Sequence, residues 1–162
     1  MSPARIRSAL PLIRTLVPSA AALLAAGMAL AQGASPAGPL AAAAAEKGAV
    51  VTASGLVYLA LAEGKGASPA ASDTVRVHYR GRFPDGREFD SSYSRGQPAA
   101  FPLNRVIRCW TEGVQRMKVG GKAKLTCPAA IAYGERGAGG VIPPNAILQF
   151  EVELLDIVKA PS

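Results

Sequence analysis

The residues of this chain that could do acid–base or nucleophilic chemistry are few. The 162-residue sequence holds one histidine, His78, and two cysteines, Cys109 and Cys127. A Ser-His-Asp or Cys-His site needs a histidine as base, yet His78 falls on the polar side of an alternating segment. A metal site is equally poorly supported, since neither CxxC nor HxxxH spacing occurs. The sequence therefore predicts no metal, no cofactor and no activated nucleophile.

Binding of phosphate groups is not indicated either. The glycine-rich residues 134–140 are not followed by Lys-Ser/Thr and a helix, as a phosphate-binding P-loop would be. The basic residues are scattered, with none of the stripes that a nucleic-acid partner requires. We expect a flexible loop at 134–140 and no nucleic-acid partner.

Aromatic and aliphatic residues stand at strand ends and in loops, where polar residues are usual. They are Phe89, Phe101, Ile107, Tyr133, Val141 and Ile142. Side chains of this kind can either close over the core or line an apolar pocket. Periodicity alone favours the core.

Strands dominate the elements that would position these residues. Residues 74–79 alternate cleanly, with Val75, Val77 and Tyr79 on one face and polar side chains on the other. Pro84-Asp85-Gly86 predicts a turn, because proline presets φ and glycine tolerates a positive φ. The expected strands cover residues 56–61, 74–79, 88–90, 122–127 and 147–158.

One short helix interrupts the strands. Ile107, Trp110, Val114 and Met117 form a single apolar stripe that would lie on a sheet. Gly120-Gly121 is expected to end the helix. The sum is an antiparallel sheet over one helix, an α+β domain.

The first 31 residues have the layout of a secretory signal peptide. Arg5, Arg7 and Arg14 form a basic start, an apolar run follows, and Ala29-Leu30-Ala31 is a small-x-small cleavage site. The alternative is an uncleaved membrane anchor, but the apolar run falls short of the ~20 residues that span a bilayer. Cleavage would lower the net charge from +7 to +4.

The rest of the chain divides into two expected parts. Residues 32–50, rich in Ala, Gly and Pro, offer few side chains for a core and predict a flexible tether. Residues 51–159 form the expected globular domain. Export by a signal peptide would place this domain in the periplasm.

Many segments of residues 51–159, in order and without large insertions, resemble the FKBP-type peptidyl-prolyl cis-trans isomerases, or immunophilins. The segments include Val77-His78-Tyr79-Arg80-Gly81, Asp85-Gly86-Arg87-Glu88-Phe89-Asp90-Ser91-Ser92, Val106-Ile107-Arg108-Cys109-Trp110, Ala132-Tyr133-Gly134 and Val141-Ile142-Pro143-Pro144. Any one tripeptide would be weak, but this many in register is a specific signal.

The resemblance implies a five- to six-stranded antiparallel half-barrel around a short helix, with an apolar pocket between them. Trp110 would form the pocket floor, the Tyr133 hydroxyl would meet one substrate carbonyl, and the Ile142 backbone N–H would hold another. The implied catalytic residues are Tyr79, Phe89, Asp90, Trp110, Tyr133 and Phe150. The implied substrate-binding residues are Phe101, Val106, Ile107, Val141 and Ile142.

The implied activity is rotation about X–Pro bonds in unfolded or partly folded polypeptides, aiding the folding of exported proteins. Macrolides of the rapamycin type would inhibit it, and the chain would be a monomer. The other function class is a binding module or holdase with the same fold and no useful catalysis. Such modules tend to lose the pocket residues, which this chain keeps.

Three questions stay open on the sequence alone. Asp90 would either contact the substrate carbonyl carbon or brace Tyr79, with Tyr79 or Arg95 as its partner. Cys109 and Cys127 would be either a disulfide, as export allows, or two buried thiols. Ala99 stands where many family members carry an aromatic residue, which would thin one wall of the pocket.

Overall fold

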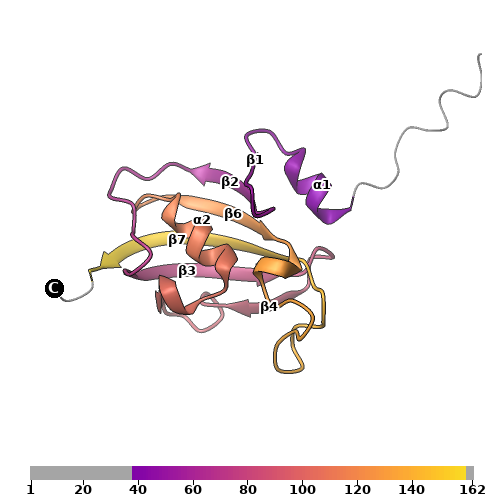
Figure 1. The fold of residues 1–162 in the computed structure, drawn as a ribbon. Helices are drawn as coiled ribbons and strands as arrows, with labels where there is room; N and C mark the ends of the chain where they lie inside the picture. Colours follow the sequence, from indigo (N-terminus) through magenta and orange to yellow (C-terminus); the bar gives the residue numbers. More distant parts are fainter. Residues whose placement is uncertain (1–37, 160–162) are drawn as a thin grey trace, which may run out of the picture. The chain divides into compact units, whose positions relative to one another are not determined.

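The computed structural model describes residues 38–159, which fold as an open antiparallel sheet with one short helix against it (Figure 1). The expected signal peptide and residues 32–37 of the expected tether lie outside this range. The sheet order is β1-β2-β6-β7-β3-β4, and β5 also pairs with β3. The strands are β1 (Val50–Val51), β2 (Val57–Ala62), β3 (Thr74–Arg82), β4 (Glu88–Ser91), β5 (Ala99–Pro102), β6 (Lys122–Cys127) and β7 (Leu148–Val158). The helices are α1 (Pro39–Ala44), η1 (Leu103–Arg105), α2 (Arg108–Gln115) and η2 (Ala129–Ile131).

The centre of the sheet is the long strand β7, which pairs with β6 on one side and β3 on the other. Alternate side chains of a strand point to opposite faces, so one face of each central strand is apolar and buried. The buried inner-face residues of β3, β6 and β7 are Val75, Val77, Tyr79, Ala123, Leu125, Cys127, Leu148, Phe150, Val152 and Leu154. The predicted apolar face of residues 74–79 is confirmed as the buried one.

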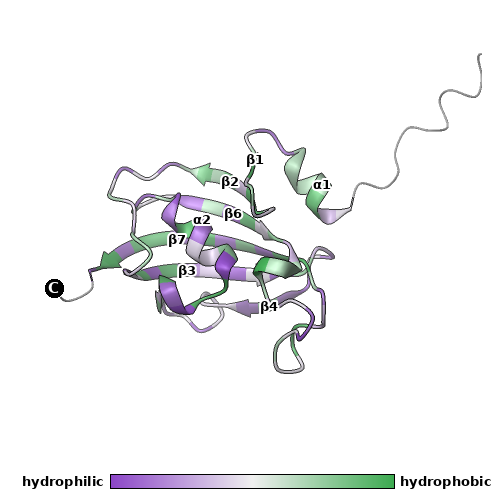
Figure 2. Cartoon of the chain, in the orientation of Figure 1, coloured by the Kyte–Doolittle hydropathy of each residue, from purple (hydrophilic) through white to green (hydrophobic). Residues whose placement is uncertain are grey.

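The outer face of the same strands carries charges that pair across the sheet. Glu151 on β7 lies 3.9 Å from both Arg82 on β3 and Lys122 on β6. His78 lies on this face, half-buried, and its ring stacks on Tyr93 at 4.7 Å between centroids. The outer face is therefore polar and the core lies on the other side. In Figure 2 hydrophobic and hydrophilic residues accordingly both occur along the central strands.

Helix α2 packs on the inner face of the sheet (Figure 1). Its apolar stripe is buried, with Val114 fully so, and Met117 continues the stripe beyond the helix. Gly113 permits the close approach, because a Cβ there would lie 2.8 Å from Leu125 side-chain carbons. The helix ends at Gln115, not at Gly120-Gly121 as expected. The Met117 N–H bonds to the Val114 carbonyl three residues back, so the chain tightens and leaves the helical path.

Residues 39–50 are not a tether, and that expectation was wrong. Residues Pro39–Ala44 form α1, and Ala43 is buried. Proline at the first turn and alanines after it favour a helix despite the absence of large side chains. Glu46 forms a salt bridge with Lys124 of β6, so this segment is attached to the sheet. No helix within the described range is long and apolar enough to cross a bilayer.

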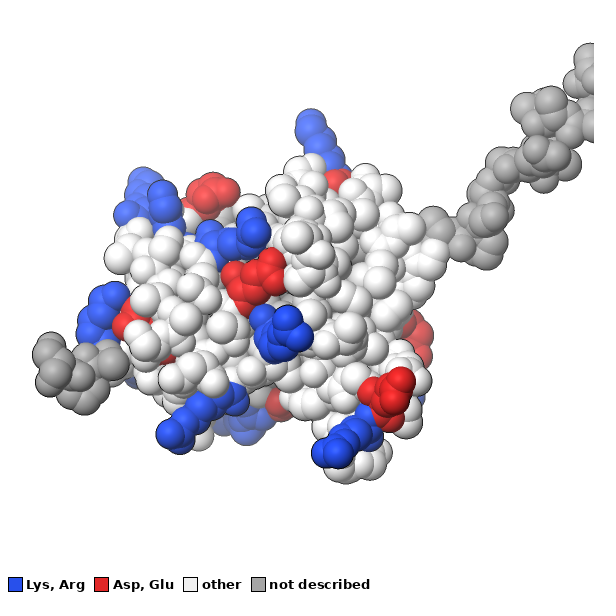
Figure 3. All heavy atoms as spheres, in the orientation of Figure 1, with Lys and Arg blue, Asp and Glu red and all other residues white. Residues whose placement is uncertain are grey.

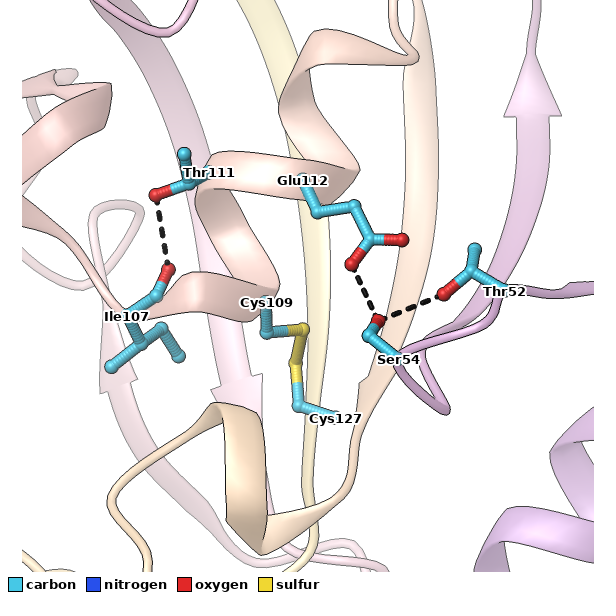
Figure 4. Close-up of a disulfide and its surroundings, with 7 residues drawn as sticks. All are labelled: Thr52, Ser54, Ile107, Cys109, Thr111, Glu112 and Cys127. Carbon is cyan, nitrogen blue, oxygen red and sulfur yellow. Dashed lines mark hydrogen bonds between the residues drawn. A yellow bond between two sulfur atoms is a disulfide. The ribbon is translucent and has the colours of Figure 1, made fainter.

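A disulfide between Cys109 and Cys127 joins the first turn of α2 to the end of β6 (Figure 4). Their Cα atoms lie 5.8 Å apart, within the usual range for such a bond. One turn further along the same side of α2, Glu112 accepts a hydrogen bond from the Ser54 hydroxyl at 2.5 Å (Figure 4). The helix is thus fixed to both β6 and the segment before β2.

Candidate functional site

A cavity of about 320 Å³ opens between the start of α2 and the inner face of the sheet. Apart from Asp90 and Arg105, its lining is aromatic and aliphatic. The lining residues are Tyr79, Phe89, Asp90, Phe101, Arg105, Val106, Ile107, Trp110, Tyr133 and Phe150. Nine of the eleven residues predicted from the sequence are among them, drawn together from β3, β4, β5, α2, β7 and two loops.

Trp110 lies at the centre of this lining and is 4% exposed. Its indole meets Tyr79, Phe101 and Phe150 nearly edge-on, at interplanar angles of 85–88° and centroid distances of 5.3–5.5 Å. Edge-to-face pairs at this range are favourable because the ring edges are positive and the faces negative. The arrangement holds each ring by its neighbours and makes a rigid apolar floor.

Asp90 belongs to a closed hydrogen-bond network with Tyr79 and Arg95. The Tyr79 hydroxyl donates to Asp90 Oδ2 at 2.5 Å, and Arg95 Nη1 donates to Asp90 Oδ1 at 2.6 Å. Arg95 Nη2 also reaches the Tyr79 hydroxyl at 2.9 Å. The Ser91 N–H donates to Asp90 Oδ1 at 2.9 Å. Both carboxylate oxygens are therefore occupied by protein donors.

The same network sets the ionisation of its members. Partial burial raises the pKa of Asp90, but the hydrogen bonds from Tyr79 and Arg95 outweigh it, and the pKa lies below its ordinary value of 3.8. Burial and the bond to Asp90 raise the pKa of Tyr79. At neutral pH Asp90 is therefore charged and Tyr79 is neutral, which suits a fixed structural group better than a proton donor.

Val141 and Ile142, the two remaining predicted residues, do not line the cavity. Val141 is 56% exposed. The Ile142 N–H donates to the Ala138 carbonyl at 2.9 Å, and the Ala138 N–H donates to the Ile142 carbonyl in return. The expectation that the Ile142 N–H would bind a substrate carbonyl is corrected, because the tight loop uses that donor itself.

Two polar groups of the lining remain without partners among residues 38–159. The Tyr133 hydroxyl makes no hydrogen bond, and the Tyr133 side chain is 41% exposed. The Ile107 N–H, at the N-cap of α2, makes none either. Both residues line the cavity, and free donors on the lining of an apolar cavity are the groups that can orient a carbonyl ligand. The sequence predicted Ile107 as a wall residue through its side chain and did not predict a role for its N–H. Its position at the start of the expected helix was the available signal, because the first N–H groups of a helix have no partner within the helix.

Arg105 is the lining residue that the sequence did not predict. It ends η1, directly before Val106 and Ile107. Its place beside two predicted wall residues was the available signal, but nothing in the sequence shows that its side chain faces the cavity. Within the described range, no three or more His, Cys, Asp or Glu side chains gather in a group that could hold a metal ion.

An open antiparallel sheet that holds one short helix, with an aromatic cavity between the two, defines the FKBP-like fold. The crystal structure of FkpA from Escherichia coli has this fold, with a TM-score of 0.71 and 52% identity over 73% of this chain and 55% of that one. A peptidyl-prolyl cis-trans isomerase from Pseudomonas syringae pv. tomato superposes with a TM-score of 0.70 and 40% identity, covering 75% of this chain and 89% of that one.

Sequence comparison agrees with the fold. Residues 65–155 match the family "FKBP-type peptidyl-prolyl cis-trans isomerase". The chain is 53% identical to FkpA of Escherichia coli K12 over 116 residues, 72% of this chain and 43% of the relative. It is 50% identical to the isomerase Mip of Coxiella burnetii over 107 residues, 66% of this chain and 46% of the relative. The chain belongs to the FKBP-type peptidyl-prolyl cis-trans isomerase family, and it spans less than half the length of these two curated relatives.

Proposed function

We propose that this chain is a peptidyl-prolyl cis-trans isomerase that accelerates X–Pro rotation without covalent chemistry and assists the folding of exported proteins. The observation that carries the proposal is the aromatic floor, with Trp110 held edge-on by Tyr79, Phe101 and Phe150. A proline ring is compact and apolar, and it fits a cavity of this size and lining. Family membership supports the same activity.

The barrier to be lowered is ~18–20 kcal/mol, because the amide loses its C–N double-bond character as it turns. A planar amide that enters an apolar cavity loses hydrogen bonds to water, at a cost of ~1–3 kcal/mol by mutational estimates. A twisted amide has a less polar carbonyl and loses less. The cavity therefore lowers the free-energy difference between the planar and the twisted amide. A thousandfold acceleration needs only ~4 kcal/mol of preferential stabilisation.

Specific residues would divide the work of holding the substrate. Trp110 and Phe150 would pack on the proline ring. The Tyr133 hydroxyl and the Ile107 N–H, both unpartnered within residues 38–159, would each hold a carbonyl of the flanking backbone, so that only one end of the bond rotates. Asp90 would brace Tyr79 rather than touch substrate, because its oxygens already accept from Tyr79, Arg95 and Ser91.

Export to the periplasm is part of the proposal. It rests on the signal-peptide layout of residues 1–31, and the Cys109–Cys127 disulfide is consistent with an oxidising compartment. On the α2 face, Lys and Arg side chains are interspersed with Asp and Glu (Figure 3), which gives no support to a nucleic-acid partner. We also propose that the mature chain is a monomer.

The direct test is a proline-limited refolding assay on the chain from Gln32 onward, with Phe150→Ala and Leu154→Ala as a matched pair. Both residues are buried on the inner face of β7, but only Phe150 lines the cavity. Each substitution should cost about 2–5 kcal/mol of stability. Phe150→Ala should also lower kcat/KM by at least about tenfold, or 1.4 kcal/mol of transition-state stabilisation. Leu154→Ala should leave kcat/KM close to that of the parent.

A macrolide such as rapamycin should inhibit the reaction and change the fluorescence of Trp110, the chain's only tryptophan. Slow prolyl steps that stay at their spontaneous rate in the presence of folded protein would refute catalysis. A fluorescence change without catalysis would instead indicate a binding module.

A further inference from the structure

The cavity mouth carries two charged residues, and only one of them is neutralised. Asp90 is bound by the guanidinium of Arg95 at 2.6 Å. Arg105 also lines the cavity, and no acidic side chain within residues 38–159 forms a salt bridge with it. The lining therefore presents one free positive charge and no free negative charge.

The backbone that bears Arg105 is held firmly. Leu103, at the start of η1, is fully buried, and its N–H donates to the Asp73 carbonyl at 3.0 Å. The Leu103 carbonyl accepts the Thr111 hydroxyl of α2 at 2.5 Å. Both hydrogen bonds are made by Leu103, so they fix the start of the η1 turn, whereas the Arg105 side chain itself is exposed. An exposed cation on a fixed turn can reach a substrate at the cavity mouth without a large cost in backbone ordering.

We infer that Arg105 is a specificity-determining residue that favours substrates with an aspartate or glutamate directly adjacent to the proline. This inference rests on the proposed isomerase function, since it concerns the same cavity. When a proline ring occupies the aromatic floor, the side chains of its neighbours must lie at the mouth, where Arg105 stands. A carboxylate there gains a planar, bidentate partner, whereas a lysine meets a like charge.

The experiment compares cis/trans exchange rates of four short peptides by NMR, which needs no coupling protease. The peptides carry Ala-Pro, Glu-Pro, Lys-Pro and Pro-Glu at the reacting bond. Because exposed ion pairs are weak, Glu-Pro or Pro-Glu should exceed Ala-Pro in kcat/KM by about two- to fivefold, and Lys-Pro should fall below it. The preference should shrink as NaCl rises from about 0.05 to 0.5 M, because salt screens exposed charges.

Three variants separate the role of Arg105 from general charge. Arg105→Gln should abolish the acidic preference, measured as the ratio of the Glu-Pro or Pro-Glu rate to the Ala-Pro rate of the same variant, and Arg105→Glu should invert it toward Lys-Pro. Arg76→Gln is the matched control, because Arg76 is exposed on β3, forms no salt bridge within the described residues and does not line the cavity. This control removes the same charge and should keep the preference.

The outcomes for the two proposals are distinct. Absence of catalysis on Ala-Pro would overturn the proposed function itself. Catalysis of Ala-Pro without an acidic preference at either position would overturn the role of Arg105 alone. An acidic preference that Arg76→Gln weakens as much as Arg105→Gln does would also overturn it, since the effect would then come from net charge.

Discussion

The cavity has two unlike walls. The strand wall consists of Tyr79 and Asp90 with Arg95, and side-chain hydrogen bonds close it into one network. The loop wall is the loop of residues 133–142, which reaches the cavity through Tyr133 alone and whose hydrogen bonds among the described residues run between backbone groups. Four glycines of this loop have a positive φ: Gly134, Gly137, Gly139 and Gly140.

The difference teaches how one cavity can be both selective and tolerant. A network of side chains around a charge permits one arrangement, so the strand wall fixes the position of Tyr79 over the floor. A glycine-rich loop with exposed backbone bonds opens locally at a lower free energy than the sheet. The loop wall can therefore adjust to different residues around the proline, while the strand wall cannot.

The largest effect on the difference between the two walls is expected from removing the Cys109–Cys127 disulfide, which anchors the loop wall. The loop follows β6, which ends at Cys127, and the disulfide ties that end to α2. The bond spans a sequence separation of 18 residues, so removing it should cost about 3 kcal/mol in the chain-entropy model. Urea unfolding with and without reductant measures the loss, and amide exchange at Ile142 should accelerate more than at Tyr79.

The double variant Cys109→Ala/Cys127→Ala is the control for the reductant. It should be as unstable as the reduced parent and should not respond to reductant. Two thiols that titrate in the denatured chain without reductant would contradict the bond itself.

A smaller effect is expected from replacing one glycine of the loop wall with alanine. A Cβ at Gly137 would lie 2.2 Å from the Ile142 carbonyl oxygen, and φ there is +64°. Gly137→Ala should therefore displace the loop, lower stability by about 2 kcal/mol and reduce kcat/KM in the peptide assay. Gly139→Ala is matched, because φ is also positive but no atom lies within 4 Å of the added Cβ. It should cost only about 1 kcal/mol. Equal effects of both changes would mean that the contact with Ile142 is unimportant.

The smallest effect concerns the strand wall and its charge. Because the folded-state pKa of Asp90 is lowered, its contribution to stability is present above the unfolded-state pKa and is lost as pH falls through the folded value. The loss should therefore begin near pH 3.8 and deepen below it. Asp90→Asn should cost about 1 kcal/mol at neutral pH, since the group is partly exposed, and should flatten this acid limb. Urea unfolding of the parent and the variant between pH 2 and 7 measures both the stability cost and its pH dependence.

The same variant sharpens the role of Asp90. If Asp90 only braces Tyr79, Asp90→Asn should change kcat/KM by no more than about fivefold, the factor that 1 kcal/mol represents. A much larger loss of activity at the same stability would assign Asp90 to substrate contact instead.

Most of the sheet could be predicted from the sequence, because a two-residue period over six or more residues is typical of a half-buried strand. The expected limits of β6 are those observed, and β7 starts one residue later than expected. Strands β1 and β5 have only two and four residues, too few to show a period. The end of α2 was misjudged because Met117 continues the apolar stripe after the backbone has left the helix.

The cavity residues could be predicted because large apolar side chains in loops and strand ends need a place to be buried. The donors could not be predicted in the same way. Whether the Ile142 N–H is free depends on a hydrogen bond to Ala138 within one short loop, and side-chain types do not reveal it. The free charge of Arg105 likewise depends on which acidic groups the fold brings near, which is a property of the tertiary structure.

The attachment of α1 to the sheet determines where a truncated protein could safely begin. A boundary at Val51, where the sequence first becomes strand-like, would cut through β1 and discard both α1 and Glu46. Lys124 would then lose its salt-bridge partner, and the surface of β2 and β6 that α1 contacts would be exposed to water. A truncated protein that keeps this attachment must therefore begin before Pro39, inside the stretch whose composition is the least like that of a folded domain.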